Sequence, residues 1–174
     1  MSTRKLALAA ASFALGLTAA LAETPNLGRP ISPADLAPWD ISIMPDGQGL
    51  PAGSGTAAQG VQLYAEQCSA CHGDKGRGGI NGSVVGNPPI DSIDAVKTVA
   101  NFWGYATTLF DFIRRAMPST QPRTLSDEQV YAVVAYILAE NKIIAETDVM
   151  NAETLPKVKM PNRDNFIIRF PDRI

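Results

Sequence analysis

Five consecutive residues, Cys68-Ser69-Ala70-Cys71-His72, decide how this chain is expected to fold. They include both cysteines and the single histidine of the 174-residue sequence. The C-x-x-C-H spacing is typical of covalent c-type haem attachment. Two thiols on one turn can each form a thioether with a haem vinyl group, and the histidine that follows then directs its imidazole at the iron. The sequence therefore predicts one covalently bound haem c, held by Cys68 and Cys71, with His72 as an axial ligand.

Other sites built from cysteine pairs are weaker explanations of this motif. A disulfide is the default for two cysteines in an oxidising compartment, but the C-x-x-C-H spacing argues against one here. A zinc site usually has four Cys or His ligands, so this chain would have to add carboxylates to complete one. A thioredoxin-like redox pair is expected within a βαβ pattern. No strand-rich pattern flanks Cys68 or Cys71.

The second axial ligand of the iron cannot be another histidine of this chain, because His72 is the only one. The soft thioether of methionine favours Fe(II), and histidine with methionine is the ligand pair of electron-transfer haems. Met117 is the predicted ligand, since it begins the loop between two expected helices. For Met44, Met150 and Met160, which lie outside the expected helical core, packing is the expected role.

Apolar periodicity and helix-end signals predict an all-α fold around the haem. The first helix is expected from Thr56 to Cys71, before a loop rich in Gly and Pro. Short helices are expected at 94–102 and 105–116, and Pro118 ends the second because the residue before a proline disfavours the helical conformation. A capping box at 126–129 begins the last helix. The apolar stripe of that helix comprises Val130, Val133, Val134, Ile137 and Leu138.

The first 22 residues have the pattern of a secretory signal peptide. Arg4-Lys5 precede an apolar run from Leu6 to Leu21, and residues 20–22 form a small-x-small cleavage site. The run is shorter than the roughly 20 apolar residues of a spanning helix. We therefore expect cleavage after Ala22, a periplasmic protein and no membrane anchor. With 15 basic and 17 acidic residues, the chain also lacks the cationic excess of nucleic-acid-binding proteins.

The expected haem domain covers residues 56–141, between an N-terminal arm at 23–55 and a C-terminal tail at 142–174. Both arms contain Pro, Gly and polar residues without a clear helical period, which is typical of flexible linkers. They also carry residues too apolar for a purely solvated chain, so we expect the arms to wrap the core or to bind a partner. These residues are Trp39, Ile41, Ile43, Phe166, Ile167, Ile168 and Phe170.

Two sets of motifs resemble known families. The haem motif with its preceding helix and Ala116-Met117-Pro118 resemble a class I cytochrome c, and Gly60 and Tyr64 facing Tyr136 are similar to a helix contact of that fold. The stretches Tyr105–Pro118 and Leu155–Asp164 resemble the haem subunits of bacterial sulfite dehydrogenases. The cytochrome subunit of the sulfur dehydrogenase in the thiosulfate-oxidising system is similar too. Shorter matches to these subunits are Trp39-Asp40, Pro45-Asp46-Gly47 and Gly53-Ser54-Gly55, and one departure is Gly104, where proline is expected.

The resemblance implies an electron-transfer role. It implies a class I cytochrome c fold with irregular N- and C-terminal arms, and a molybdenum-cofactor dehydrogenase for sulfite or another sulfur compound as the partner that supplies electrons. A downstream cytochrome c or terminal oxidase receives them, and no substrate chemistry is expected in this chain alone. The alternatives are a freely diffusing periplasmic shuttle and a five-coordinate haem that binds a gas or peroxide. Met117 argues against the five-coordinate haem.

Further side chains are expected to support the haem. Trp103, Tyr105, Arg114 and Arg115 are candidates to hydrogen-bond or neutralise its propionates, because buried carboxylates need paired donors. The other explanation is a set of core aromatics and a solvated charge pair. His72 is expected to donate its second ring N–H to a backbone carbonyl in the loop from Ile80 to Gly86, as ligating histidines usually do.

Overall fold

The computed structural model describes residues 27–166, which form two units. The expected signal peptide at 1–22 and the tail residues Ile167, Ile168 and Phe170 lie outside these described residues. The first unit ends at Asp40 and contains the short helix α2 (Pro33–Leu36). Ser32 caps α2 by accepting a hydrogen bond from the Asp35 N–H, while the Asp35 carboxylate accepts one from the Ser32 N–H. This reciprocal pair satisfies two of the free N–H groups at the helix start.

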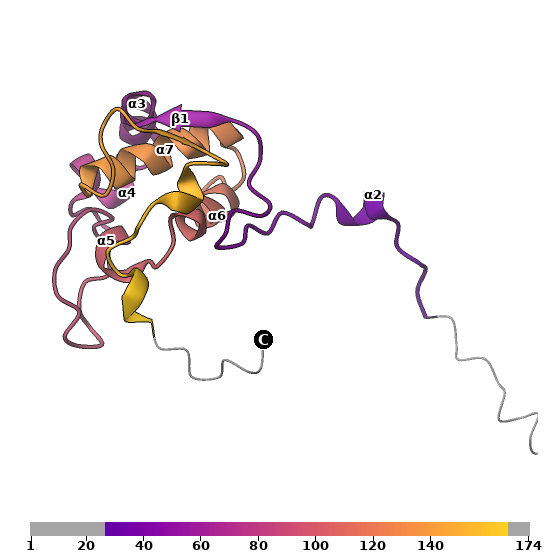
Figure 1. Cartoon of the computed structure of the whole chain (residues 1–174), viewed down its shortest axis with the longest axis horizontal. Coiled ribbons are helices and arrows are strands. Elements are labelled where there is room, and N and C mark those ends of the chain that lie inside the picture. Colours follow the sequence, from indigo (N-terminus) through magenta and orange to yellow (C-terminus); the bar gives the residue numbers. More distant parts are fainter. Residues whose placement is uncertain (1–26, 167–174) are drawn as a thin grey trace, which may run out of the picture. The chain divides into compact units, whose positions relative to one another are not determined.

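The second unit begins at Ile41 and is mostly helical, which confirms the expected fold class (Figure 1). Strand β1 (Ser54–Thr56) pairs antiparallel with β2 (Val149–Asn151), with Gly55 opposite Met150. These two short strands bring segments before and after the helices together. The α-helices are α3 (Ala57–Gln67), α4 (Ser69–His72), α5 (Val99–Phe102), α6 (Ala106–Ala116) and α7 (Asp127–Glu140). Three 3-10 turns complete the unit: η1 (Asp74–Gly76), η2 (Leu155–Lys157) and η3 (Arg163–Asn165).

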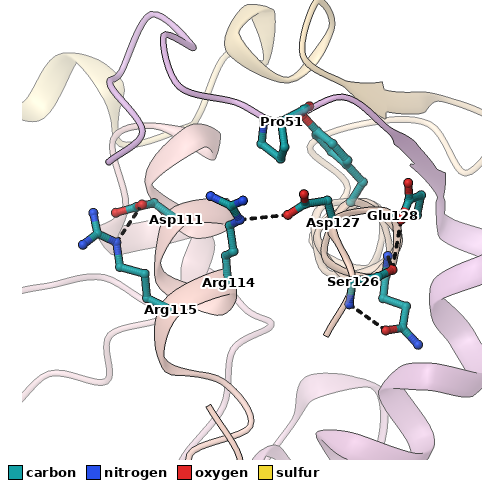
Figure 2. A network of polar contacts seen from close by, with 9 residues as sticks. Pro51, Asp111, Arg114, Arg115, Ser126, Asp127 and Glu128 are labelled. Atoms are coloured by element: carbon teal, nitrogen blue, oxygen red, sulfur yellow. Dashed lines mark hydrogen bonds and ion pairs between the residues drawn. The ribbon is translucent and has the colours of Figure 1, made fainter. Parts of the chain in front are cut away.

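Helix α7 forms the centre of the core. Ser126 and Gln129 make the predicted capping box at its start (Figure 2). Every residue from Val130 to Ala139 is buried. Helix α3 crosses α7 at Gly60, where a Cβ would meet the Ala132 carbonyl oxygen and lie 2.7 Å from the Tyr136 Cβ. The rings of Tyr64 and Tyr136 pack with their centroids 4.9 Å apart. The predicted contact between these two helices is confirmed.

Two helices differ from their predicted lengths. The helix expected from Thr56 to Cys71 is interrupted at Cys68, so that α3 and α4 are separate. Next to the break, the Ser69 Oγ donates a hydrogen bond of 2.6 Å to the Ala65 carbonyl, a bond that often bends helices. The helix expected at 94–102 begins only at Val99, because Thr98 caps it by accepting a hydrogen bond from the Asn101 N–H.

Parts of both arms pack against the helices. Of the apolar arm residues singled out in the sequence, Ile43 is buried in the core, whereas Trp39 and Phe166 are 79% and 57% exposed. The tail instead buries Met150, Leu155 and Met160. Hydrogen bonds hold the N-terminal segment in place: the Tyr131 hydroxyl donates to the Pro51 carbonyl over 2.9 Å (Figure 2). Segments that precede and follow the helices in sequence thus both pack against them. Within residues 27–166, the helices are too short or too polar to cross a bilayer.

Candidate functional site

A cavity of about 420 Å³ lies beside the haem motif. Cys68, Cys71 and His72 line it from the break between α3 and α4, and Met117 lines it from the end of α6. The structure therefore brings together all four residues predicted to hold the haem. Most of the remaining wall is apolar, as a macrocycle requires. Its apolar residues include Val84, Val99, Leu109, Phe112, Ile113, Val133 and Ile137.

His72 is oriented by the loop that follows it. Its Nδ1 lies 3.1 Å from the carbonyl oxygen of Gly82. Because a carbonyl oxygen only accepts, Nδ1 must carry the proton, which leaves Nε2 as the nitrogen with a free lone pair for iron. The predicted carbonyl from the loop at 80–86 is confirmed, and the structure identifies it as that of Gly82.

The loop folds back onto α4 through backbone hydrogen bonds. The Asn81 N–H donates to the Cys71 carbonyl over 2.9 Å. The N–H groups of Val84 and Val85 both donate to the Gly76 carbonyl over 2.9 Å. Gly73 allows this fold with a φ of +79°, where an added Cβ would collide with the Arg77 carbonyl. The backbone thus holds the Gly82 carbonyl against the imidazole.

Asn141, at the end of α7, holds the later part of this loop through hydrogen bonds. Its side chain accepts a hydrogen bond from the Gly86 N–H over 2.9 Å and donates to the carbonyls of Val84 and Ile137. Sequence analysis missed this residue. An asparagine directly after a long apolar helix is a weak signal, because asparagine is also common at helix ends without any long-range contact.

Met117 differs from the other methionines in its surroundings. It directly follows α6 in extended conformation, and its N–H donates to the Ile113 carbonyl over 3.0 Å. Met150 and Met160 are 3% and 1% exposed within the core, whereas Met44 is 50% exposed, and none of the three lines the cavity. Among the methionines at 27–166, only Met117 is therefore placed where a haem ligand is needed.

The candidates for propionate contacts are spread over the structure. Trp103 lines the cavity, with its ring edge-on to Phe112 at a centroid distance of 5.5 Å. The other three candidates do not line the cavity, and each contacts another side chain instead. The Arg114 Nε donates to Asp127 over 2.8 Å and the Arg115 Nε to Asp111 over 2.9 Å (Figure 2), and the Tyr105 ring stacks under Arg163.

Cys68 and Cys71 are each partly buried and form no disulfide with each other. Burial raises the pKa of the Cys68 thiol to about 11, and the nearby Cys71 adds to the effect. In the described part of the chain, no group of three or more His, Cys, Asp or Glu is arranged to hold a metal ion by itself.

The donor set and the cavity together fit one haem c. Two thiols, one imidazole with its tautomer set by Gly82, and one thioether line a largely apolar space. The wall also contains Tyr64, whose hydroxyl is buried without a hydrogen-bond partner within residues 27–166. A protein that folds without a ligand in this space would leave the apolar wall in contact with water, which is unfavourable.

Comparisons with known proteins agree with this geometry. A family model described as cytochrome c oxidase, cbb3-type, subunit III matches residues 55–137. The thiosulfate dehydrogenase of Stutzerimonas stutzeri (strain A1501) is 34% identical over 113 residues, or 57% of this chain. The chain spans only 35% of that protein's length.

A solved structure extends the similarity to the fold. A chain in the crystal structure of the sulfane dehydrogenase SoxCD from Paracoccus pantotrophus matches with a TM-score of 0.76 and 34% identity, covering 86% of this chain and 73% of that one. The family model covers the haem motif and the helices around it, and the structural match extends over most of the chain. The fold, the cavity and these relatives together show that the chain belongs to the class I cytochromes c and carries covalently bound haem c. It resembles the cytochrome subunit of sulfur dehydrogenases.

Proposed function

We propose that this cytochrome is the electron-transfer subunit of an exported dehydrogenase for sulfite or another sulfur compound. A molybdenum-cofactor partner supplies electrons one at a time, and a downstream cytochrome c or terminal oxidase takes them up. The observation that carries the proposal is the single cavity lined by Cys68, Cys71, His72 and Met117. The relatives named for thiosulfate and sulfane oxidation support a sulfur compound as the substrate class.

Each of these residues has a proposed role in holding the cofactor. Cys68 and Cys71 form the two thioether bonds, and His72 and Met117 are the axial ligands. When bound, a haem with this ligand pair supplies one-electron chemistry at its iron, and the thioether favours the reduced state. The Gly82 carbonyl keeps the imidazole in one tautomer and orientation, which also makes it a better donor to the metal.

The wall of the cavity contributes to the same chemistry. Apolar residues from α6 and α7, including Leu109, Ile113 and Val133, keep water away from the site. A low dielectric disfavours the extra positive charge of Fe(III), so the wall acts in the same direction as Met117. We propose that the Trp103 indole N–H contacts a propionate, because Trp103 is the one candidate of the four that lines the cavity.

We propose that the protein is exported to the periplasm, on the basis of the signal-peptide pattern at 1–22. The experiment isolates the native protein gently from the periplasmic fraction and quantifies iron and molybdenum in the same eluted peak. We expect a mature N-terminus at Glu23 and about one molybdenum per iron, because a stable subunit stays with its partner during isolation.

Sulfite and thiosulfate are then added separately to this fraction, and reduction of the haem is followed by its absorbance. Reduction by either one identifies the substrate. Iron alone, at one per chain, would contradict the subunit proposal and favour a freely diffusing shuttle. An unprocessed N-terminus would contradict the proposed export.

A further inference from the structure

A second pocket, of about 390 Å³, opens on the surface where the tail passes the start of α6. Three cations line it: Lys157, Lys159 and Arg163. The one acidic residue in its lining is Asp46, whose carboxylate accepts a hydrogen bond from the Gln48 N–H over 2.9 Å. The pocket therefore has an excess of positive charge in a chain whose formal net charge is −2. All three cations belong to the tail motif at 155–164, which takes no part in the haem site described above.

The structure holds this basic pocket in a defined shape. The guanidinium carbon of Arg163 lies 3.6 Å from the centroid of the Tyr105 ring, which is a cation–π contact. The Asn162 side chain donates a hydrogen bond of 2.8 Å to the Phe102 carbonyl. Leu155 and Met160, on either side of the two lysines, are anchored in the core. A surface that is already ordered loses less conformational entropy when a partner binds.

The basic pocket adjoins the haem cavity through one short segment of chain. Trp103 lines the cavity, while Gly104 and Tyr105 line the basic pocket. A partner bound at the basic pocket thus contacts the same segment of chain that lines the haem cavity. Electron exchange between proteins depends on such closeness, so a docking site here would be useful to an electron carrier.

The exposure of the cations indicates which kind of anion they suit. Lys157, Lys159 and Arg163 are all exposed, and none of them takes part in the three ion pairs formed within residues 27–166. Exposed charges bind a small ion weakly, because water and salt screen them. Several exposed charges of one sign do accelerate association with an extended surface of the opposite sign. An acidic protein surface fits this pattern better than a free oxyanion.

We propose that Lys157, Lys159 and Arg163 form a docking site for an acidic surface patch on the dehydrogenase that reduces this cytochrome. The inference rests on the proposed function, since it identifies where the electron-donating partner binds. Tyr105 orients Arg163, and the buried residues Leu155 and Met160 keep the two lysines beside the segment at 103–105.

The experiment uses the haem-loaded protein with the molybdenum-cofactor dehydrogenase isolated from cells that lack this cytochrome and supplied with its sulfur substrate, so that the two subunits meet only on mixing. Stopped-flow absorbance measures the second-order rate constant of haem reduction at several ionic strengths. We expect Lys157→Gln with Lys159→Gln to lower this rate constant about tenfold at low ionic strength. The difference between variant and wild type should shrink as salt is added, because salt screens the same charges.

Three controls separate docking from damage to the haem site. Lys75→Gln with Lys142→Gln removes the same charge from exposed lysines that line neither pocket, and should leave the rate unchanged. Lys157→Arg with Lys159→Arg keeps the charge and should retain the rate. Reduction by ascorbate, which needs no docking site, should be equally fast in every variant, and the reduction potential should stay constant.

The outcomes distinguish this proposal from the proposed function. Equal rates for wild type and Lys157→Gln with Lys159→Gln would overturn the docking site alone. A wild-type haem that no such dehydrogenase reduces would overturn the proposed function, and the docking site with it. Saturable sulfate binding measured by calorimetry, lost in the glutamine variant while its reduction rate is unchanged, would assign the pocket to a small oxyanion and overturn docking.

Discussion

His72 and Met117 show how single residues are prepared for their role by backbone around them. The imidazole is held by the Gly82 carbonyl, and Met117 leaves α6 in extended conformation directly before Pro118. The chain therefore presents a nitrogen and a sulfur to the same cavity.

Replacement of Met117 by alanine tests the proposed sixth ligand. We expect the ferric protein to bind cyanide at least about tenfold more tightly, because the wild type must first give up an iron–sulfur bond. The reduction potential should fall, since the thioether that favours Fe(II) is gone. Spectrophotometric cyanide titration and potentiometry measure the two effects.

Met44→Leu is the matched control, because Met44 is exposed and lies outside the cavity. Its affinity for cyanide and its potential should equal those of the wild type. If wild type and Met117→Ala bound cyanide equally well, Met117 would not be the ligand.

At the scale of the elements, the crossing of α3 and α7 decides where the haem motif lies. The two helices approach closely because Gly60 has no side chain, and the Ala132 backbone and Tyr136 fill the space beside it. Cys68 follows directly after α3, so the position of α3 on α7 also sets the position of the first thiol. A small residue remote from the cofactor thereby controls the geometry of its attachment.

Gly60→Ala tests this close approach. Alanine in an ordinary helix stabilises it by about 1 kcal/mol relative to glycine. Here we expect the opposite sign, a loss of about 1–3 kcal/mol in the free energy of unfolding, because the new Cβ would overlap backbone atoms of Ala132. Denaturant unfolding of the haem-loaded protein measures the change.

Ala58→Gly, at an exposed position of the same helix, calibrates the propensity term, and should cost about 1 kcal/mol. A rise in stability for Gly60→Ala would show that the two helices are not in close contact at this point.

At the scale of the whole second unit, which begins at Ile41, the segments that flank the helices are part of the fold. The tail contributes Met150, Leu155 and Met160 to the core, and β2 pairs with β1 ahead of α3 (Figure 1). The same tail carries the basic pocket. Burial of the tail thus stabilises the fold and also places Lys157 and Lys159 beside the segment that leads to the haem cavity.

Leu155→Ala tests whether the tail stabilises the whole unit. Leu155 is 0% exposed, so we expect its truncation to lower the free energy of unfolding by about 2–5 kcal/mol. Val149→Ala, at a position 43% exposed, should cost much less and serves as the control. Equal and small effects for both variants, in the same denaturant experiment, would mean that the tail folds independently of the helices.

The haem motif, its ligands and the main helices could be predicted from sequence because each depends on local signals. Cys68, Cys71 and His72 are adjacent in the chain, the capping box at Ser126 begins α7, and Pro118 ends α6. Short-range sterics and hydrogen bonds decide such features, so they are readable in a single chain. Met117 could be chosen because the one histidine was already used and a loop between helices suits a distal ligand.

Tertiary structure alone decided which polar side chains serve the site. Asn141 holds the haem loop, Arg114 pairs with Asp127 of another helix, and the Tyr105 ring stacks on Arg163. Long polar side chains can reach several partners, and the choice depends on residues that are distant in sequence. The basic pocket combines residues near 45, 105 and 157–163, which only the packed tail brings together. The spacing of the two cysteines and the histidine along the chain thus determined the cofactor. Packing between distant segments determined the surface around it.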